Sequence, residues 1–160
     1  MPAPSYKVMP CYSIGQTMMQ TRFTHMSLSV RYINPTELKD EWPWVREKLL
    51  VVQRKSPESW IPEEIYCQCF NQDAMLWVGY EFNKPLCMFI LVPLGDTVGI
   101  SVAWSESEPV ADEALKHIEG IARQGNARFI EFRTWRRGWE KRARQMGFRP
   151  RAWVKEISNE

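Results

Sequence analysis

The sequence predicts one α/β (α+β) domain with a mixed, mostly antiparallel sheet and helices on both faces. Three observations predict this class. Segments with strand-like apolar patterns alternate with amphipathic segments along most of the chain. Residues 99–148 read as strand, helix, strand and helix with short connections, so their two strands should be parallel neighbours. Finally, a chain of 160 residues with 44% hydrophobic side chains suffices for one full core but hardly for two.

The first elements follow from local periodicity. Residues 28–33 alternate apolar and polar side chains, which predicts a half-buried strand. A helix should follow, with Asn34 as its cap, Pro35 in its first position and apolar residues at three- and four-residue steps up to Val52. Pro43 lies inside this pattern and should kink or divide the helix. A second helix should begin at Pro62, after a turn.

The remaining elements alternate strands with helices. A helix should begin at Pro109 and end at Gly125, which is expected to adopt the left-handed conformation of a helix cap. The last helix should turn Trp139, Ala143 and Met146 inward. Strands are expected at residues 75–82, 86–92, 98–104 and 128–133, with a closing strand at 148–157. The second of these is apolar throughout, which is typical of a central strand covered on both faces.

Residues 1–26 differ from the rest of the chain. They contain several prolines and a Met, Gln, Thr and Ser mixture without helical or strand periodicity. We therefore expect an irregular N-terminal extension at 1–26 and a folded domain at 27–160. Such an extension is expected to contact a partner protein or a second copy of the chain.

Charge is concentrated near the C-terminus. Residues 133–151 contain eight basic residues and one acid, Glu140, whereas the net charge of the whole chain is only +2. The four cysteines have irregular spacing, and no Cys or His pair has metal-ligand spacing, so no metal site is expected. No apolar run reaches the length of a membrane span and no signal peptide is recognised, which favours a cytoplasmic protein with reduced thiols.

This element order, followed by Arg-Gln-Met-Gly-Phe at 144–148, resembles the GNAT (acyl-CoA N-acyltransferase) superfamily. The resemblance covers residues 28–157. It implies a sheet that splays between its fourth and fifth strands, here 98–104 and 128–133, with an acyl-CoA thioester in the gap.

Two positions depart from the pattern of that superfamily. Its pyrophosphate loop is glycine-rich, but the corresponding turn at 105–112 has no glycine and no basic residue. Instead it places several acids near a helix N-terminus, where they would oppose an anionic ligand: Glu106, Glu108, Asp112 and Glu113. Pro109 removes one backbone donor. In addition, the position of the tyrosine that would protonate the leaving thiolate holds Ala143.

These departures favour a catalytically degenerate domain that acts as a structural or protein-interaction component and needs no cofactor. Within the superfamily, the chain looks most like the reduced GNAT-like proteins of tailed phages, which implies a role in a virion or its assembly and localisation there. Residues 1–26 and the basic C-terminal segment are the expected contacts with a protein partner or a second copy. The expected partner-binding residues are Arg133, Trp135, Arg136, Arg137, Lys141 and Arg144.

Two alternatives stay open. The first is an active acetyl-CoA-dependent N-acetyltransferase, with Glu81 or Glu131 as general base. Its CoA would be bound by Val102, Ala103, Trp104, Arg136 and Arg137. The second is a small nucleic-acid-binding protein that uses the basic segment 133–151, because arginines interleaved with tryptophans suit phosphate contacts and base stacking.

Overall fold

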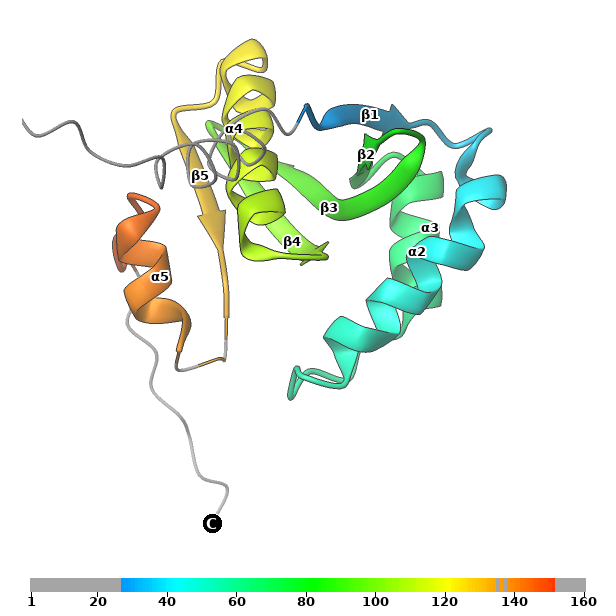
Figure 1. Cartoon of the computed structure of the whole chain (residues 1–160), viewed down its shortest axis with the longest axis horizontal. Helices are drawn as coiled ribbons and strands as arrows, with labels where there is room; N and C mark the ends of the chain where they lie inside the picture. Colours follow the sequence, from blue (N-terminus) through cyan, green and yellow to red (C-terminus); the bar gives the residue numbers. More distant parts are fainter. Residues whose placement is uncertain (1–26, 135, 137, 152–160) are drawn as a thin grey trace, which may run out of the picture.

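The computed structural model describes residues 27–134, 136 and 138–151, and within them nine helices and strands (Figure 1). The N-terminal half contains β1 (Ser29–Ile33), α2 (Leu38–Gln53), α3 (Pro62–Phe70) and β2 (Met75–Glu81). The C-terminal half contains β3 (Lys84–Leu94), β4 (Thr97–Ser105), α4 (Glu108–Gln124), β5 (Phe129–Phe132) and α5 (Trp139–Gln145). The predicted order of elements is confirmed up to α5.

The five strands form one sheet in chain order. The pairs β1–β2, β2–β3 and β3–β4 are antiparallel, and only β4–β5 is parallel. The predicted class, a mixed and mostly antiparallel sheet, is therefore confirmed. The helix α4 connects the two parallel strands, as their short connections required.

Helices cover both faces of the sheet (Figure 1). On one face, α2 buries Leu38, Val45 and Leu49 against residues of β2 and β3, and α3 adds Ile65 and Cys69 to the same core. On the other face, α4 buries Val110, Ala114 and Ile118 against Phe89 and Leu91 of β3. Since β3 contributes to both cores, it is the central strand that its apolar sequence predicted.

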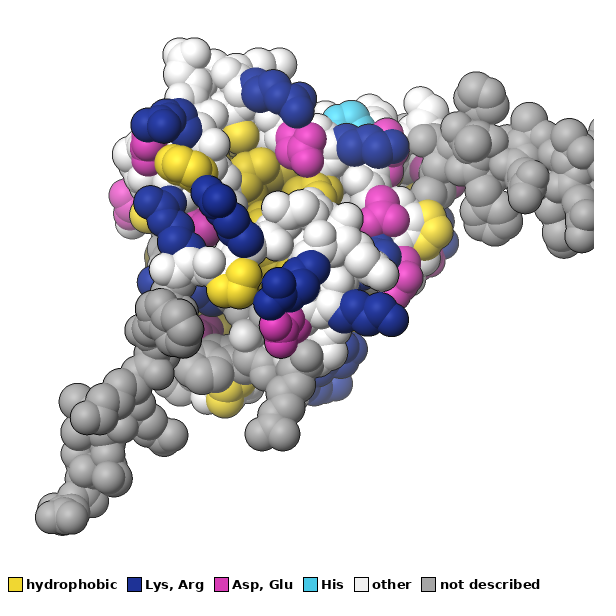
Figure 2. Space-filling view, turned by 90° about the vertical axis from the view of Figure 1, so that its left-hand side faces the viewer, with side chains coloured by type: hydrophobic (Ala, Val, Ile, Leu, Met, Phe, Trp, Pro, Cys, Tyr) yellow, Lys and Arg dark blue, Asp and Glu magenta, His cyan; other side chains and the backbone are white. Residues whose placement is uncertain are grey.

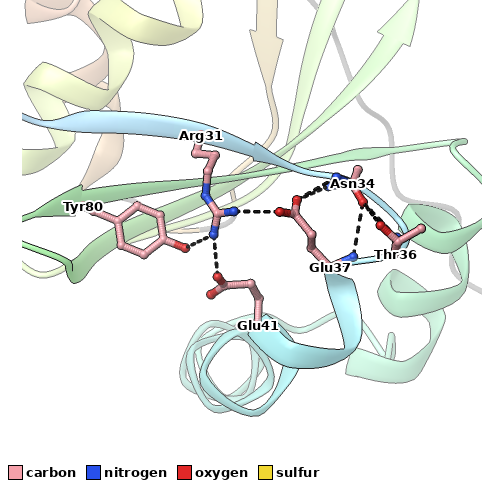
Figure 3. A network of polar contacts seen from close by, with 6 residues as sticks. All are labelled: Arg31, Asn34, Thr36, Glu37, Glu41 and Tyr80. Atoms are coloured by element: carbon pink, nitrogen blue, oxygen red, sulfur yellow. Dashed lines mark hydrogen bonds and ion pairs between the residues drawn. The ribbon is translucent and has the colours of Figure 1, made fainter.

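A polar network joins β1 to the start of α2 (Figure 3). Arg31 donates hydrogen bonds to Glu37 at 2.9 Å and to Glu41 at 2.7 Å, and contacts the Tyr80 hydroxyl on β2 at 3.4 Å. The hydrogen bond to Tyr80 raises the pKa of Arg31 despite some desolvation, so its charge persists at every practical pH. The network fixes the edge strand against the first helix.

The start of α2 differs from the prediction. The Asn34 side chain accepts hydrogen bonds from the backbone N–H groups of Thr36 and Glu37, at 3.0 and 3.2 Å, so it caps a turn that precedes the helix. The helix itself begins at Leu38, and its 16 residues run through Pro43 without interruption. The sequence predicted a kink or a division at Pro43, and the helix is not divided there, because the proline lies in the second turn and removes only one intrahelical bond.

The β2–β3 connection is tighter than expected. Phe82 and Asn83 form a two-residue turn, with φ of 48° and 63°, which is the backbone of a type I′ hairpin. Phe82 was expected to be the last residue of the strand at 75–82, but it lies in the turn and its side chain is 96% exposed. The turn ends the strand one residue early and points this side chain into solvent.

Three further expectations concern chain ends and caps. Gly125 has a φ of −82°, so the predicted left-handed cap is wrong, and Asn126, with a φ of 56°, adopts that conformation instead. Within the closing strand expected at 148–157, residues 148–151 are not in a strand, and 152–157 lie outside the described residues. The extension at 1–26 also lies outside them, so its separation from the domain stays a prediction.

Candidate active site

The parallel strands β4 and β5 separate along their length. They pair from Thr97 opposite Phe129 to Ile100 opposite Phe132, and no further. Beyond Ile100, β4 continues to Ser105 in register with β3 alone. Ser101 is an extra residue in that ladder, and such a bulge increases local twist. Within the described ranges, no strand pairs with the β4 edge from Ser101 to Ser105 that faces the separation.

A cavity of about 340 Å³ lies at this separation, within the range of ligand pockets. We call it the wedge cavity. Its lining includes Ser101, Val102, Ala103 and Trp104 of β4. It also includes residues from both cores: Val52 and Trp60 from the α2 and α3 side, and Ala114 and Ile118 from α4. The cavity thus adjoins both faces of the sheet.

The predicted donor-site residues lie at this cavity. Val102, Ala103, Trp104 and Arg136 all line it, whereas Arg137 lies outside the described residues. The C-terminal wall is formed by Phe132 of β5 and residues that follow it, and it contains Arg133 and Arg136 beside aromatic and apolar side chains. Phe132 contacts Trp139 at 5.7 Å and Phe148 at 4.8 Å between ring centroids, and all three line the cavity with Met146.

The acids near the start of α4 are ion-paired. Arg142 of α5 contacts Asp112 at 2.7 Å and Glu108 at 3.5 Å. Lys84 contacts Glu106 at 2.9 Å, and Lys116 contacts Glu113 at 2.9 Å. The four acids thus meet three cations, so the charge opposing an anionic ligand is smaller than the sequence of this turn indicates. Lys84 and Arg142 come from other parts of the fold, whereas Lys116 lies three residues after Glu113 on α4. The sequence of the turn alone does not reveal the first two.

The wedge cavity has no conventional acid–base residue among the described lining. No Asp, Glu, His, Cys or Tyr lines it in that part of the chain, and its charged groups are Lys55, Arg133 and Arg136. Glu81 lies at the end of β2 and Glu131 is exposed on β5 opposite Gly99, and neither lines the cavity. Ala143 lies half-buried on α5, outside the lining.

Basic side chains gather on the face that β5 and α5 form, with apolar side chains between them (Figure 2). Of the expected partner-binding residues, Arg133 and Arg136 line the wedge cavity. Lys141 and Arg144 lie exposed on α5, where Arg144 is paired with Glu140 at 2.9 Å. Trp135 lies outside the described residues, as Arg137 does.

Sequence reasoning missed the contribution of the α2–α3 connection to the site. Lys55, Ser56 and Trp60 line the cavity although some 40 residues separate them from β4. These residues follow a helix and do not form a recognised catalytic or binding motif. The one available signal was an aromatic residue, Trp60, in the same connection as Lys55.

No protein-family model matches the sequence, and no curated protein does. Similar folds occur among solved structures. The aminoglycoside acetyltransferase meta-AAC0020, from an uncultured soil metagenomic sample and in complex with sisomicin, has a TM-score of 0.61 and 10% identity, over 83% of this chain and 95% of that one. A ribosomal-protein-alanine N-acetyltransferase from Brucella melitensis has a TM-score of 0.62 and 6% identity, over 84% and 100% of the chains.

A predicted acetyltransferase from Clostridium acetobutylicum, solved with acetyl-CoA, has a TM-score of 0.59 and 14% identity, over 82% of this chain and 96% of that one. The chain therefore has the fold of the GNAT acetyltransferases, as its element order predicted. At these identities the likeness defines the fold alone. No helix in the described part of the chain is long and apolar enough to cross a membrane.

Proposed function

We propose that this chain is an acyl-CoA-dependent N-acyltransferase whose donor thioester lies in the wedge cavity. The observation that carries the proposal is the unpaired edge of β4 from Ser101 to Ser105 along that cavity. A strand edge offers backbone N–H and C=O groups to an extended amide-containing chain. The pantetheine arm of CoA is such a chain. A solved structure of similar fold contains acetyl-CoA, which supports the same reading.

The reaction needs few protein groups. The lone pair of a neutral amine attacks the thioester carbonyl carbon, a C–N bond forms, and the C–S bond breaks. The proton released from nitrogen goes to the departing thiolate, directly or through water. The contribution of the cavity is to hold both reactants together, which by itself lowers the barrier substantially. Ala143 supplies no proton to the thiolate, so this step depends on the amine proton or on solvent.

The phosphates of the donor require positive groups outside the narrow cavity. Arg133 and Arg136 line its C-terminal wall, and neither forms an ion pair with another described residue. They are available to an anionic donor, whereas Arg142 is already paired with two acids. The two arginine side chains would take the place of the backbone N–H donors of a glycine-rich turn, because the turn before α4 has no glycine.

Titration calorimetry with acetyl-CoA tests the proposal, together with an assay for transfer to a panel of amines. We expect binding that Ser101→Trp abolishes by filling the cavity at the bulge. Ser29→Trp is the matched control, since Ser29 is likewise exposed on a strand but does not line the cavity. Equal loss of binding in both variants, or no binding in the parent chain, would contradict a donor site at the wedge.

A second candidate is a non-catalytic, protein-interacting domain. The absence of a carboxylate, histidine, cysteine or tyrosine from the described cavity lining favours it, as does the lack of glycine in the turn before α4. A structural role in a phage virion or its assembly belongs to this candidate. It predicts no acyl transfer to any amine, together with tight binding of a protein partner through the basic face of β5 and α5.

A further inference from the structure

We propose that the wedge cavity selects a weakly basic primary amine beside an apolar or aromatic group as its acceptor. The cavity keeps that amine neutral through its own positive charge rather than through a general base. This inference rests on the proposed N-acyltransferase function. It specifies the acceptor class, which the fold leaves open.

The first support is the sign of the charges around the cavity. The charged groups among the described lining residues are Lys55 of the α2–α3 connection and, after β5, Arg133 and Arg136. With the two arginines paired with the donor phosphates, Lys55 is the lining cation left to act on the acceptor. The lining residues of β3, β4, α4 and α5 carry no titratable side chain. The nearby acids are not in the lining and are already paired: Glu106 with Lys84, and Glu108 and Asp112 with Arg142.

The second support is a further cation beside the β4 wall. Lys48 of α2 has its Nζ 4.9 Å from the centroid of the Trp104 ring and 5.8 Å from that of Trp44. Its side chain is only 18% exposed, and its ammonium forms an ion pair at 2.7 Å with Glu47, which is 66% exposed. Lys48 thus adds a positive group next to Trp104, and its pairing with Glu47 reduces the net charge that it contributes.

These charges act on the protonation of a bound amine. A positive neighbour disfavours the ammonium form, so it lowers the pKa of an amine held in the cavity. Only the neutral form can attack the thioester. For an α-amino group, whose ordinary pKa is about 8, a modest decrease makes the neutral form dominant near neutral pH. For an alkyl amine with an ordinary pKa above 10, the same decrease leaves nearly all of it protonated.

The aromatic residues that line the cavity determine which chemical group can lie next to the amine of the acceptor. The cavity is bordered by the rings of Trp60, Trp104, Trp139, Phe132 and Phe148. An apolar or aromatic group adjacent to the amine would be buried there favourably. A polycationic acceptor would meet only like charge from the described lining, without a carboxylate to balance it. The proposed acceptor class therefore excludes polycations such as the aminoglycosides.

A matched pair of acceptors tests this inference. Phenylalanine amide and 2-phenylethylamine share the ring and the primary amine, but the carboxamide makes the first amine much less basic. With acetyl-CoA as donor at pH 7, we expect at least tenfold faster acetylation of phenylalanine amide and none of an aminoglycoside. The inflection of kcat/KM against pH should follow the solution pKa of each amine, because no enzyme base titrates.

Variants separate the charge effect from mere binding. The inflection in kcat should lie below the solution pKa of the amine, and Lys55→Gln should raise it by roughly half a pH unit. Lys39→Gln is the control, since Lys39 is exposed at the start of α2 and does not line the cavity. Thermal melts verify that both variants are folded.

The outcomes distinguish the two proposals. An inflection at the same pH for both amines would reveal an enzyme base and overturn the inference, as would a preference for the aminoglycoside. Binding of acetyl-CoA without transfer to either phenyl amine would overturn the acceptor class and leave the donor site standing. Absence of acetyl-CoA binding would overturn the N-acyltransferase itself.

Discussion

Cys69 and Cys87 show how burial alters single side chains in this chain. Each is buried in a different core, one beside α2 and α3 and the other beside α4. Burial raises the pKa of each thiol from 9.0 to about 11, because the thiolate would be poorly solvated. Both are therefore neutral packing groups near pH 7, whereas Cys67 is exposed.

This shift predicts a loss of stability in alkali. Above pH 9 the thiols of the unfolded chain lose protons before those of the folded chain, so the unfolded state binds fewer protons. The free energy of unfolding should fall as the pH rises from about 9 to 11, by roughly 1–2 kcal/mol per thiol, and these groups should have no effect below that range. Denaturant titrations across this range measure the fall.

Single-cysteine variants assign the effect. Cys69→Ala should make the decline with pH shallower, even though it lowers stability at every pH. Cys67→Ala should leave the decline unchanged, because its thiol is exposed in both states. The same slope in all three proteins would show that other groups cause the alkaline loss.

At the level of elements, the hairpin of β2 and β3 depends on close backbone packing. Gly79 sits beside a register shift in this pair, opposite Cys87. A Cβ added at Gly79 would lie 2.6 Å from the Cys87 Sγ and 3.1 Å from the Leu28 methyl carbons. Both neighbours are buried, so a larger residue at Gly79 has no free space.

We expect Gly79→Ala to destabilise the fold by about 1–3 kcal/mol, through overpacking. Gly120→Ala is the matched control. Its Cβ would meet nothing within 4 Å in the middle of α4, so it should stabilise by up to about 1 kcal/mol through helix propensity. Adding Cys87→Ala to Gly79→Ala should restore part of the lost stability. Additive destabilisation in the double variant would show that the Sγ contact is not the cause.

At the level of the whole molecule, β5 is paired with β4 over only part of its neighbour's length, and α5 lies beyond the end of this pairing. Pairing of β5 to the sheet ends at Phe132, and beyond it the wedge cavity separates the two parts. The ion pairs of Arg142 with Glu108 and Asp112 join α5 to the start of α4. The width of the cavity therefore depends on a small number of polar contacts.

Arg142→Ala should loosen α5 more than it destabilises the protein. Exposed ion pairs contribute about 0.2–1 kcal/mol each, so the loss of stability should be about 1 kcal/mol or less. Hydrogen exchange of the α5 amides should accelerate several-fold. Arg144→Ala, which breaks a pair within α5 only, should lower stability slightly and leave α4 unaffected. Equal exchange in both variants would contradict the proposed attachment.

The sequence alone determined the order of the elements and the faces they bury. Helical spacing identified Leu38, Val45 and Leu49 as core residues, and the uninterrupted apolar run identified β3 as central. These properties are local, because apolar residues that recur every 3.6 positions in a helix, or every 2 in a strand, indicate which side of the element is buried. The backbone conformations at Phe82 and Asn126 were not predicted, because the same residue types can adopt several conformations in a turn.

Only the tertiary structure decided the composition of the site. Lys55 and Trp60 reach the cavity from the α2–α3 connection, and Arg142 reaches the acids of α4 from α5. Such contacts join residues that are far apart in the chain, and no local pattern encodes them. The sequence indicated a strongly acidic start of α4, whereas in the fold Lys84 and Arg142 pair with these acids. The charged residues in the described lining of the cavity are all positive. Electrostatics depends on the distances between charges, and those distances come from packing.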